Sequence, residues 1–183
     1  MRVISGILKG RNIEGFNIIG TRPTMDRIKE SIFSMIQNHI KDAIVLDLFA
    51  GSGNYGIEAY SNGAKFIYAN DSNKKCIEVI KKNLNNFNII EKFNVLNMDY
   101  KECLNYLKNK NIKLDLIFLD PPYKMDICKK IIDFLVNNQI LNKNALVICE
   151  VINNNLEQQV DVLNLIKTKK YGEKYVLIYK NDI

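Results

Sequence analysis

Short apolar runs alternate with amphipathic segments through the middle of this chain. The apolar runs have the length of strands and occur at residues 43–49, 65–71, 92–98, 114–119 and 145–151. Each of the first four is followed by a segment with helical spacing of apolar residues, at residues 54–63, 73–87, 99–110 and 126–138. Strands that alternate with helices predict a parallel sheet covered on both faces, and right-handed crossovers favour a doubly wound α/β sandwich.

The two ends of the chain depart from this alternation. Residues 21–40 predict a helix that begins near Pro23 and places Ile28 and Ile32 on one apolar stripe. Residues 162–180 contain two strand-like runs around the turn sequence YGEK, which predicts a hairpin. The expected fold is therefore a Rossmann-like sandwich: a mostly parallel seven-stranded sheet with an antiparallel C-terminal hairpin, preceded by an N-terminal arm and helix.

The length of 183 residues suits one domain with a full core rather than two domains. We expect a single domain over residues 1–183, in which residues 1–40 form the arm and helix and residues 41–183 form the ligand-binding core. The chain is 47% hydrophobic and 25% charged, which is ordinary for a globular protein and argues against disorder.

A glycine loop follows the first predicted strand. The sequence DLFAGSGNYG contains G-x-G-x-x-G as Gly51, Gly53 and Gly56, and Asp71 ends the next strand 18 residues after Gly53. A strand, glycine loop, helix, strand and acid in this order are typical of nucleotide-binding α/β domains, in which the acid accepts hydrogen bonds from ribose hydroxyls. Asp99, after the third strand, is placed either to accept from an adenine amino group or to cap the next helix.

Asp47 helps to discriminate between two classes of ligand. It lies four residues before Gly51, close to where a dinucleotide would place its pyrophosphate, so its charge disfavours that ligand. S-adenosylmethionine carries a sulfonium and an ammonium group and no phosphate, and its ribose would suit Asp71. The glycines would then allow close approach of the backbone to the ligand rather than bind an anion.

The fourth strand ends in the sequence DPPY. Asp120 precedes Pro121 and Pro122, which have no N–H and restrict the residue before each of them to extended conformations. The Asp120 carboxylate and the Pro121 carbonyl can therefore accept the two N–H groups of an exocyclic amine, while Tyr123 can stack on a base. Holding such an amine beside a methyl donor supplies proximity, which can lower a barrier by roughly 7 to 11 kcal/mol without a strong base. The alternative is a rigid turn with a buried aspartate.

The basic residues indicate an anionic partner. Lysine plus arginine minus aspartate plus glutamate is 26 − 20 = +6, and the pI is about 9.0. All four arginines lie in the first 27 residues, at Arg2, Arg11, Arg22 and Arg27. Because a guanidinium binds phosphate in a bidentate way, this clustering predicts a phosphate-contacting arm, with helix-face salt bridges as the alternative.

Other residue classes restrict the chemistry. The four cysteines contain no C-x-x-C pair, so buried, reduced thiols are expected and neither a metal site nor a disulfide framework is predicted. His39, the one histidine, is expected on the surface or near a helix end. No apolar run reaches the roughly 18 to 20 residues that span a bilayer, and residues 1–11 lack a signal-peptide pattern, so a cytoplasmic protein without membrane contact is expected.

The motifs together resemble a known family. DLFAGSG with DPPY is similar to class I S-adenosylmethionine-dependent amino-methyltransferases. RVISGILKGR and TRPTMDRIKESIFSMI, followed by ALVICE and KKYGEKYVLIYK, resemble the RsmD-type 16S ribosomal RNA (guanine-N2)-methyltransferases. The likeness runs from residue 2 to about residue 180. DPPY is shared with adenine and cytosine amino-methyltransferases of DNA, so it indicates the reaction and not the substrate, whereas the R-P-T-x-D-R segment is more specific.

The resemblance implies roles for individual residues. Those expected to hold S-adenosylmethionine and its product S-adenosylhomocysteine are Asp47, Phe49, Gly51, Gly53, Asn54, Asp71, Ser72, Asp99 and Tyr100. The family carries a glutamate where Asp71 stands, and the shorter acid still reaches hydroxyl groups. The catalytic residues expected to hold the guanine are Asp120, Pro121, Pro122 and Tyr123. The residues expected to border the site or touch RNA are Lys9, Arg11, Arg22, Thr24 and Arg27.

The implied substrate is a guanine of 16S ribosomal RNA, in the small subunit or an assembly intermediate, and a monomeric enzyme is expected. Since guanine N2 is used in base pairing, the target would be in a loop or flipped out of its helix. Three alternatives remain open: a DNA amino-methyltransferase, a nicotinamide-dependent oxidoreductase, and a binding module that kept the fold without the chemistry.

Overall fold

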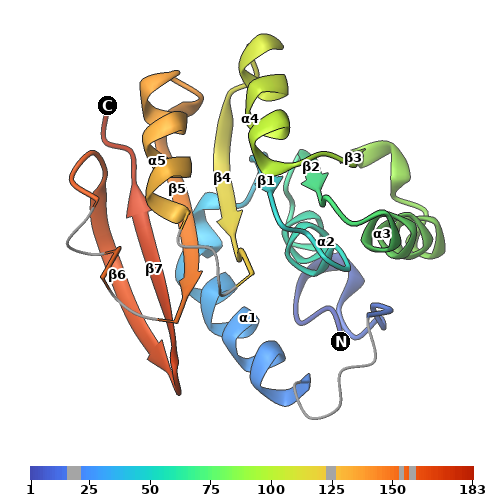
Figure 1. The fold of residues 1–183 in the computed structure, drawn as a ribbon. Helices are drawn as coiled ribbons and strands as arrows, with labels where there is room; N and C mark the ends of the chain where they lie inside the picture. Colours follow the sequence, from blue (N-terminus) through green and yellow to red (C-terminus); the bar gives the residue numbers. More distant parts are fainter. Residues whose placement is uncertain (16–21, 123–126, 153–154, 157–159) are drawn as a thin grey trace.

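The protein folds around one mixed sheet, seen in the computed structural model, which describes the chain except residues 16–21, 123–126, 153–154 and 157–159 (Figure 1). Seven strands are arranged in the order β3-β2-β1-β4-β5-β7-β6. Their bounds are β1 Ile44–Asp47, β2 Phe66–Asn70, β3 Phe93–Leu96, β4 Leu114–Leu119, β5 Leu141–Val151, β6 Asn164–Tyr171 and β7 Lys174–Lys180. The first five strands are parallel to one another, and β7 is antiparallel to both β5 and β6, as the sequence predicted.

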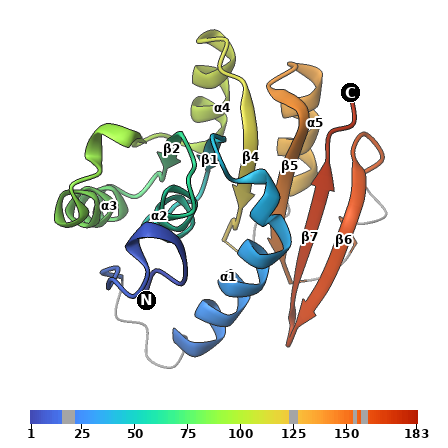
Figure 2. The ribbon, with the colours of Figure 1, turned by 180° about the vertical axis from the view of Figure 1, so that it is seen from behind.

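Helices cover both faces of the sheet. Their bounds are α1 Arg22–Ile36, α2 Asn54–Ser61, α3 Lys74–Phe87, α4 Tyr100–Asn109 and α5 Cys128–Asn137, with short 3-10 turns η1 Gly6–Leu8, η2 Gln37–His39 and η3 Ile90–Lys92. The buried residues of α1, α2 and α3 share one hydrophobic cluster, and those of α4 and α5 share the other. Figure 2 shows α1 lying over β4 and β5 on the face opposite α4 and α5.

The central strands are buried on both sides, which explains their unbroken apolar runs. In β4, Leu116 and Phe118 enter the cluster under α1, and Ile117 and Leu119 enter the cluster under α4 and α5. Alternate residues of a strand point to opposite faces, so a strand covered by helices on both sides has no polar face. None of the helices in the described residues is long and apolar enough to cross a bilayer.

Strand β5 differs from the sequence expectation. It begins at Leu141 rather than at residue 145, because Leu141 pairs with Leu114 before the register shifts to Leu146 opposite Leu116. The intervening residues include Asn144 with a φ of 64°. A polar, irregular start of this kind has no period-two pattern, and pairing with β4 alone extends the strand there.

The smaller predictions about single residue types are confirmed. The four cysteines, Cys76, Cys103, Cys128 and Cys149, are buried and free of disulfides. His39 ends the 3-10 turn after α1 and is exposed. Burial raises the pKa of the Cys103 thiol to about 12, so this thiol stays protonated at neutral pH.

The N-terminal segment packs against α2 through a buried ion pair. Lys29 Nζ lies 2.8 Å from Glu58 Oε2, and both side chains have 0% exposure. Glu58 also accepts the backbone N–H groups of Ile4 (2.9 Å) and Ser5 (2.9 Å), while Lys29 donates to the Arg2 carbonyl (2.7 Å). Each buried charge therefore has several partners, and together they join the N-terminal segment, α1 and α2.

Gly6 allows the N-terminal segment to approach α2 closely. Its φ is +78°, and a Cβ atom at this position would lie 1.8 Å from the Ser61 carbonyl oxygen. Any other residue would both strain the backbone and push the segment away from the helix. The SG pair in RVISGILKGR thus has a packing reason.

We predict that Lys29→Met destabilises the fold far more than the same change at an exposed ion pair. The variant leaves Glu58 as a buried charge without its cation, which costs about 3 to 5 kcal/mol. Lys82→Met is the matched control, because the Lys82–Glu14 pair is 63% and 47% exposed and contributes at most about 1 kcal/mol. Urea unfolding of both variants measures the difference, and equal losses would contradict the structural role of the buried pair.

Candidate active site

Three carboxylates lie together where neighbouring parallel strands end. Asp47 closes β1, Asp120 follows β4, and Glu150 lies near the end of β5. Asp47 pairs in register with Phe118, and Phe118 pairs with Ile148. Asp120 and Glu150 each come two residues after a member of this row, so the carboxylates share the face covered by α1 and α2. The carboxyl edge of an open α/β sheet is where such folds bind ligands.

The negative charges of this cluster are poorly balanced. The pKa of Asp47 is raised to about 7, chiefly by burial, with the Gly56 N–H lowering it and Asp71 and Glu150 raising it further. The pKa of Asp120 is likewise raised to about 7 by burial and by Glu150, with Lys174 opposing. Both shifts mean that the site resists taking up negative charge. A cationic ligand would relieve this cost, and a pyrophosphate would increase it.

Tyr55 covers the cluster from α2. Its ring stacks on Phe118 with centroids 5.0 Å apart and an interplanar angle of 9°, and its hydroxyl donates to Glu150. Burial and the Glu150 charge raise the pKa of Tyr55 well above its ordinary value, so the hydroxyl remains a donor. Lys174 of β7 lies 3.4 Å from the other Glu150 oxygen. Tyr55 and Lys174 thereby contact both carboxylate oxygens of Glu150.

Glu150 and Tyr55 were not predicted from the sequence. The usable signal for Glu150 is the same one that identifies Asp47 and Asp120, an acid at the end of an apolar strand run. Tyr55 lies inside the glycine motif, but nothing local shows that its hydroxyl reaches a residue 95 positions away.

The glycine loop leaves open space beside the carboxylates. Gly51 has a φ of +55°, and a Cβ atom there would meet no heavy atom within 4 Å. Gly56 serves packing instead, because a Cβ there would lie 3.0 Å from Ile67 and 3.2 Å from Phe93. Asp47 Oδ2 accepts the Gly56 N–H at 3.0 Å, which links β1 to the first turn of α2. The first glycine therefore faces space that a ligand can enter, and the third joins helix to sheet.

Asp71 and Asp99 both bind backbone N–H groups. Asp71 accepts from Gly51 (2.9 Å) and Asn73 (2.8 Å), and Ser72 beside it is exposed. Asp99 caps α4 within a capping box, as one of its two predicted readings proposed. Each carboxylate oxygen has two lone pairs, so these bonds leave acceptor capacity for ligand hydroxyls or amines. Cofactor binding by these residues stays a prediction.

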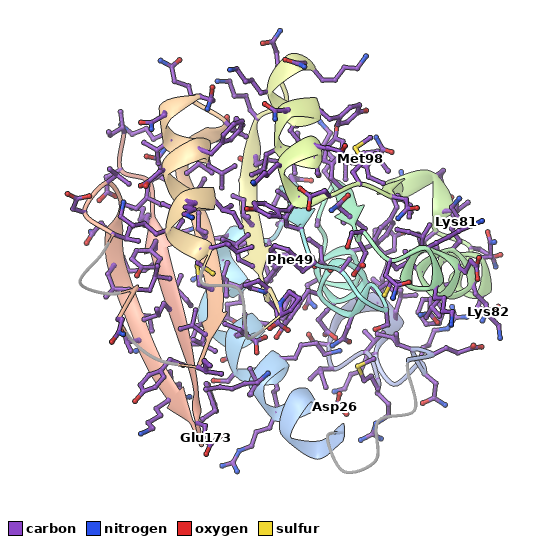
Figure 3. All side chains as sticks on the ribbon, viewed as in Figure 1. Asp26, Phe49, Lys81, Lys82, Met98 and Glu173 are labelled. Atoms are coloured by element: carbon purple, nitrogen blue, oxygen red, sulfur yellow. The ribbon has the colours of Figure 1, made fainter. Side chains whose placement is uncertain are left out.

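Two aromatic rings come from the residues that follow β1 and Asp99 in the chain. Phe49 and Tyr100 are half-buried, and their ring centroids are 6.1 Å apart with an interplanar angle of 43°. Phe49 lies near the centre of the view in Figure 3, where β1 and β4 end. Such a pair offers an apolar surface for a planar group.

The Asn70 side chain explains the polar end of β2. Its Nδ2 donates to the carbonyls of Leu48 (3.2 Å) and Met98 (3.1 Å), so one buried amide links the ends of β1 and β3. This bridge holds the acids that follow β2 and β3 in place beside the glycine loop.

Several predicted residues have partners inside the protein. Asn54 is buried, and its Oδ1 accepts from Lys29 Nζ at 2.7 Å. Arg11 donates to the Asn86 carbonyl (2.7 Å), and its guanidinium lies 4.4 Å from the centre of the Phe87 ring. The first contact joins α1 to α2, and the second fixes the N-terminal segment to α3. Their ligand or RNA contacts stay predictions.

The remaining predicted residues are placed as follows. Lys9 and Arg27 are exposed, Pro121 is buried, and Pro122 is exposed. Arg22 and Thr24 lie in the first turn of α1. Tyr123 falls outside the described residues, so its stacking role stays a prediction. Gly53 adopts a left-handed φ of 79° as the N-cap of α2.

Comparisons with known proteins agree with this architecture. The family model with the description Conserved hypothetical protein 95 matches residues 1–180. Ribosomal RNA small subunit methyltransferase D of Buchnera aphidicola subsp. Acyrthosiphon pisum is 40% identical over 81% of this chain and 76% of its own, and that of Haemophilus influenzae is 32% identical over 99% and 94%. The solved structure of the Escherichia coli protein yhhF superposes with a TM-score of 0.87 at 28% identity, covering 100% of this chain and 98% of that one.

We predict that Asp47→Asn stabilises the free protein, increasingly so as the pH rises. The folded-state pKa of Asp47, about 7, lies above the ordinary value of 3.8, so the folded state binds this proton more tightly than the unfolded state does. The contribution of Asp47 to unfolding free energy therefore falls as pH rises from about 4 to about 7, by up to about 1.4 kcal/mol per pH unit.

Asparagine has no such penalty and can still accept the Gly56 N–H. Denaturant unfolding of both proteins between pH 5 and pH 8 measures the difference, with Asp161→Asn, at an exposed aspartate, as the control. A stability difference between Asp47→Asn and the parent protein that did not change with pH would show that Asp47 carries no raised pKa.

Proposed function

This chain belongs to the family described as Conserved hypothetical protein 95, the RsmD-type methyltransferases, and on that premise we propose that it methylates N2 of a guanine in 16S ribosomal RNA with S-adenosylmethionine as donor. The observation that carries the proposal is the cluster of Asp47, Asp120 and Glu150 beside an open glycine loop, in which the raised pKa values of Asp47 and Asp120 favour a cationic ligand. Two relatives, matched over 81% and 99% of this chain, bear names that state small-subunit ribosomal RNA methylation.

The residues at this edge fit S-adenosylmethionine. Asp47 and the open space at Gly51 would hold its positively charged methionine portion, and Asp71 would accept from the ribose hydroxyls. Asp99, with the rings of Phe49 and Tyr100, would hold the adenine. When bound, S-adenosylmethionine supplies an electrophilic methyl group, and the chain's task is to orient the amine that receives it.

Asp120 is the residue that binds and orients the amine. Its carboxylate and the Pro121 carbonyl accept the two N–H groups of guanine N2, because the prolines supply no competing donor. This orientation directs the nitrogen lone pair, which is otherwise delocalised into the ring. As the new N–C bond forms, one N–H proton must leave, and the Asp120 carboxylate to which it is hydrogen-bonded can accept it.

The surroundings of Asp120 suit that step. Burial and the Glu150 charge raise the pKa of Asp120 to about 7, which makes its carboxylate a stronger base than an ordinary aspartate. Tyr55 and Lys174 contact Glu150 directly, so they act on Asp120 through Glu150. Tyr123 is expected to stack on the base.

The alternatives are less well supported. A nicotinamide dinucleotide would bring its pyrophosphate to Asp47, whose pKa is already raised by burial and by neighbouring acids. A DNA amino-methyltransferase would use the same acceptors at residues 120–121 and therefore differs only in substrate. A binding module without chemistry would need no base at Asp120.

We predict that Asp120→Asn abolishes methyl transfer without abolishing cofactor binding. Asparagine keeps the size of the side chain but loses the charge that orients the amine and accepts its proton, so turnover should fall by about 100-fold or more. Affinity for S-adenosylmethionine, measured by calorimetry, should change by only a few-fold. Asp161→Asn, at an exposed aspartate, should behave as the parent protein. Full turnover by Asp120→Asn would remove this residue from the mechanism.

The substrate is tested by methyl transfer to separate acceptors. Tritiated S-adenosylmethionine is supplied with naked 16S ribosomal RNA, with small subunits from a strain lacking the protein, and with duplex DNA. We expect incorporation into RNA or subunits and none into DNA, and mass spectrometry of the digested RNA should show N2-methylguanine. Label in DNA alone would favour the DNA enzyme, and N2-methylguanine at unchanged levels in the deficient strain would refute the proposal.

A further inference from the structure

A basic groove lies between α1 and the C-terminal hairpin, β6 and β7. It has a volume of about 530 Å³ and is lined by Arg27 and Ser31 of α1 and by Lys169 and Tyr171 of β6, among others. Lys169 Nζ donates to Ser31 Oγ at 2.8 Å, and the Tyr171 hydroxyl hydrogen-bonds the same atom. These bonds fix the position of the hairpin against the helix. We call this feature the hairpin groove.

The strand register places a row of basic side chains on the groove side of the sheet. Lys167 and Lys169 lie opposite Ile178 and Val176 of β7, which belong to the hydrophobic cluster under α1. Lys167 and Lys169 therefore project toward α1, roughly 7 Å apart along the strand. Lysines on an edge strand can also serve to prevent pairing with strands of other molecules. That role does not explain why these lysines lie beside a groove that Arg27 also lines.

The charges in this row are available to a partner. Among the ion pairs of the described residues, none involves Arg27, Lys167 or Lys169, and all three side chains are exposed. Lys174 differs, because it is paired with Glu150. The acids nearest along the chain to Arg27 and Lys169 are Asp26 and Glu173, and neither forms an ion pair with them in the part of the chain that the structure describes.

The groove lies beside the candidate active site. Val151, at the end of β5, pairs with Tyr175, so the hairpin turn projects past the carboxyl edge of the parallel strands. Figure 3 shows Glu173 at the hairpin tip and Asp26 on α1 at the end of the molecule where those strands end. In Figures 1 and 2, α1 lies between the hairpin and the N-terminal segment, so the groove and that segment flank α1 on opposite sides.

We propose that the hairpin groove binds the sugar-phosphate backbone of the RNA substrate. The active site is lined by Asp47, Asp120 and Glu150 and repels a polyanion, so a nearby basic surface must offset this repulsion for RNA to approach. The Arg11 guanidinium is engaged with α3, which leaves the groove as a basic surface that points to solvent. The inference rests on the proposed action on ribosomal RNA, and it adds to the predicted Arg27 a contact surface on β6 that the sequence did not indicate.

The test compares two double variants with the same loss of charge. Lys167→Gln with Lys169→Gln removes the two charges of the β6 row and leaves Arg27 in place. Lys108→Gln with Lys110→Gln removes two exposed charges at the end of α4, which covers the face of the sheet opposite α1 (Figure 1). Binding of a naked 16S ribosomal RNA transcript is measured by fluorescence anisotropy from 50 to 200 mM KCl. S-adenosylmethionine affinity and the thermal midpoint are measured in parallel.

We expect the groove variant to lose about 10-fold in RNA affinity and its slope of log K against log salt to become shallower by about 1 to 2, as for the loss of one or two phosphate contacts. Cofactor affinity and thermal midpoint should match those of the control. RNA affinity and salt slope equal to the control would overturn the proposal. So would failure of the parent protein to bind naked RNA at 50 mM KCl.

Failure of the proposed function gives a different result. If the parent protein binds RNA through the groove but transfers no methyl group to RNA or small subunits, the methyltransferase assignment fails and the RNA-binding surface stands. If it methylates RNA and the groove variant has an unchanged KM for that RNA, the groove inference fails alone.

Discussion

Mutual repulsion among carboxylates at one edge of the sheet is the constraint on which the site depends. Asp47, Asp120 and Glu150 end three adjacent strands and share one face, so the Glu150 charge raises the cost of ionising both aspartates. Burial by Tyr55 and the surrounding core adds to that cost. A fold keeps such an arrangement only where a ligand offsets it, and a phosphate-free cation does so while an anionic nucleotide does not.

The rest of the structure makes this unfavourable cluster tolerable. The strands that carry the carboxylates are covered on both faces, so the cluster rests on two hydrophobic cores. The Lys29–Glu58 pair joins α1 and α2 above one of these cores, and the same Lys29 holds Asn54 at the start of the helix that follows the glycine loop. The rigid elements around the site therefore offset the unfavourable free energy of the carboxylate cluster. Such rigid surroundings suit precise positioning of a methyl acceptor.

A negative site and a polyanionic substrate impose opposite electrostatic demands, and the molecule separates them in space. The carboxylates are concentrated beneath Tyr55 and the glycine loop, while basic side chains lie on the surfaces to either side. The net charge of +6 is consistent with attraction of a polyanion, but it does not show where on the surface the basic side chains lie. Long-range attraction can then bring RNA to the surface while the short-range field at the strand ends remains suited to a cation.

Much of the fold could be predicted from the sequence, because the signals for it are local. Apolar runs of strand length, helical spacing between them, the YGEK turn and the glycine motif each lie within about 20 residues, and they were sufficient for the order of elements, the antiparallel hairpin and the strand-end acids Asp47 and Asp120. The capping role of Asp99 could also be predicted, because a helix cap contacts only the first residues of the helix that follows it.

The pairings between residues far apart in the sequence were decided only by the tertiary structure. Tyr55 meets Glu150 across 95 positions and Ser31 meets Tyr171 across 140, and no local pattern encodes either contact. Arg11 is a second case: its position in an arginine-rich segment predicted a phosphate contact, and the structure shows it packed on Phe87. The start of β5 is a third, because pairing with β4 extends a polar segment into a strand. The sequence gives the functional group of each side chain, but the fold determines its partner, because the sheet brings particular elements together.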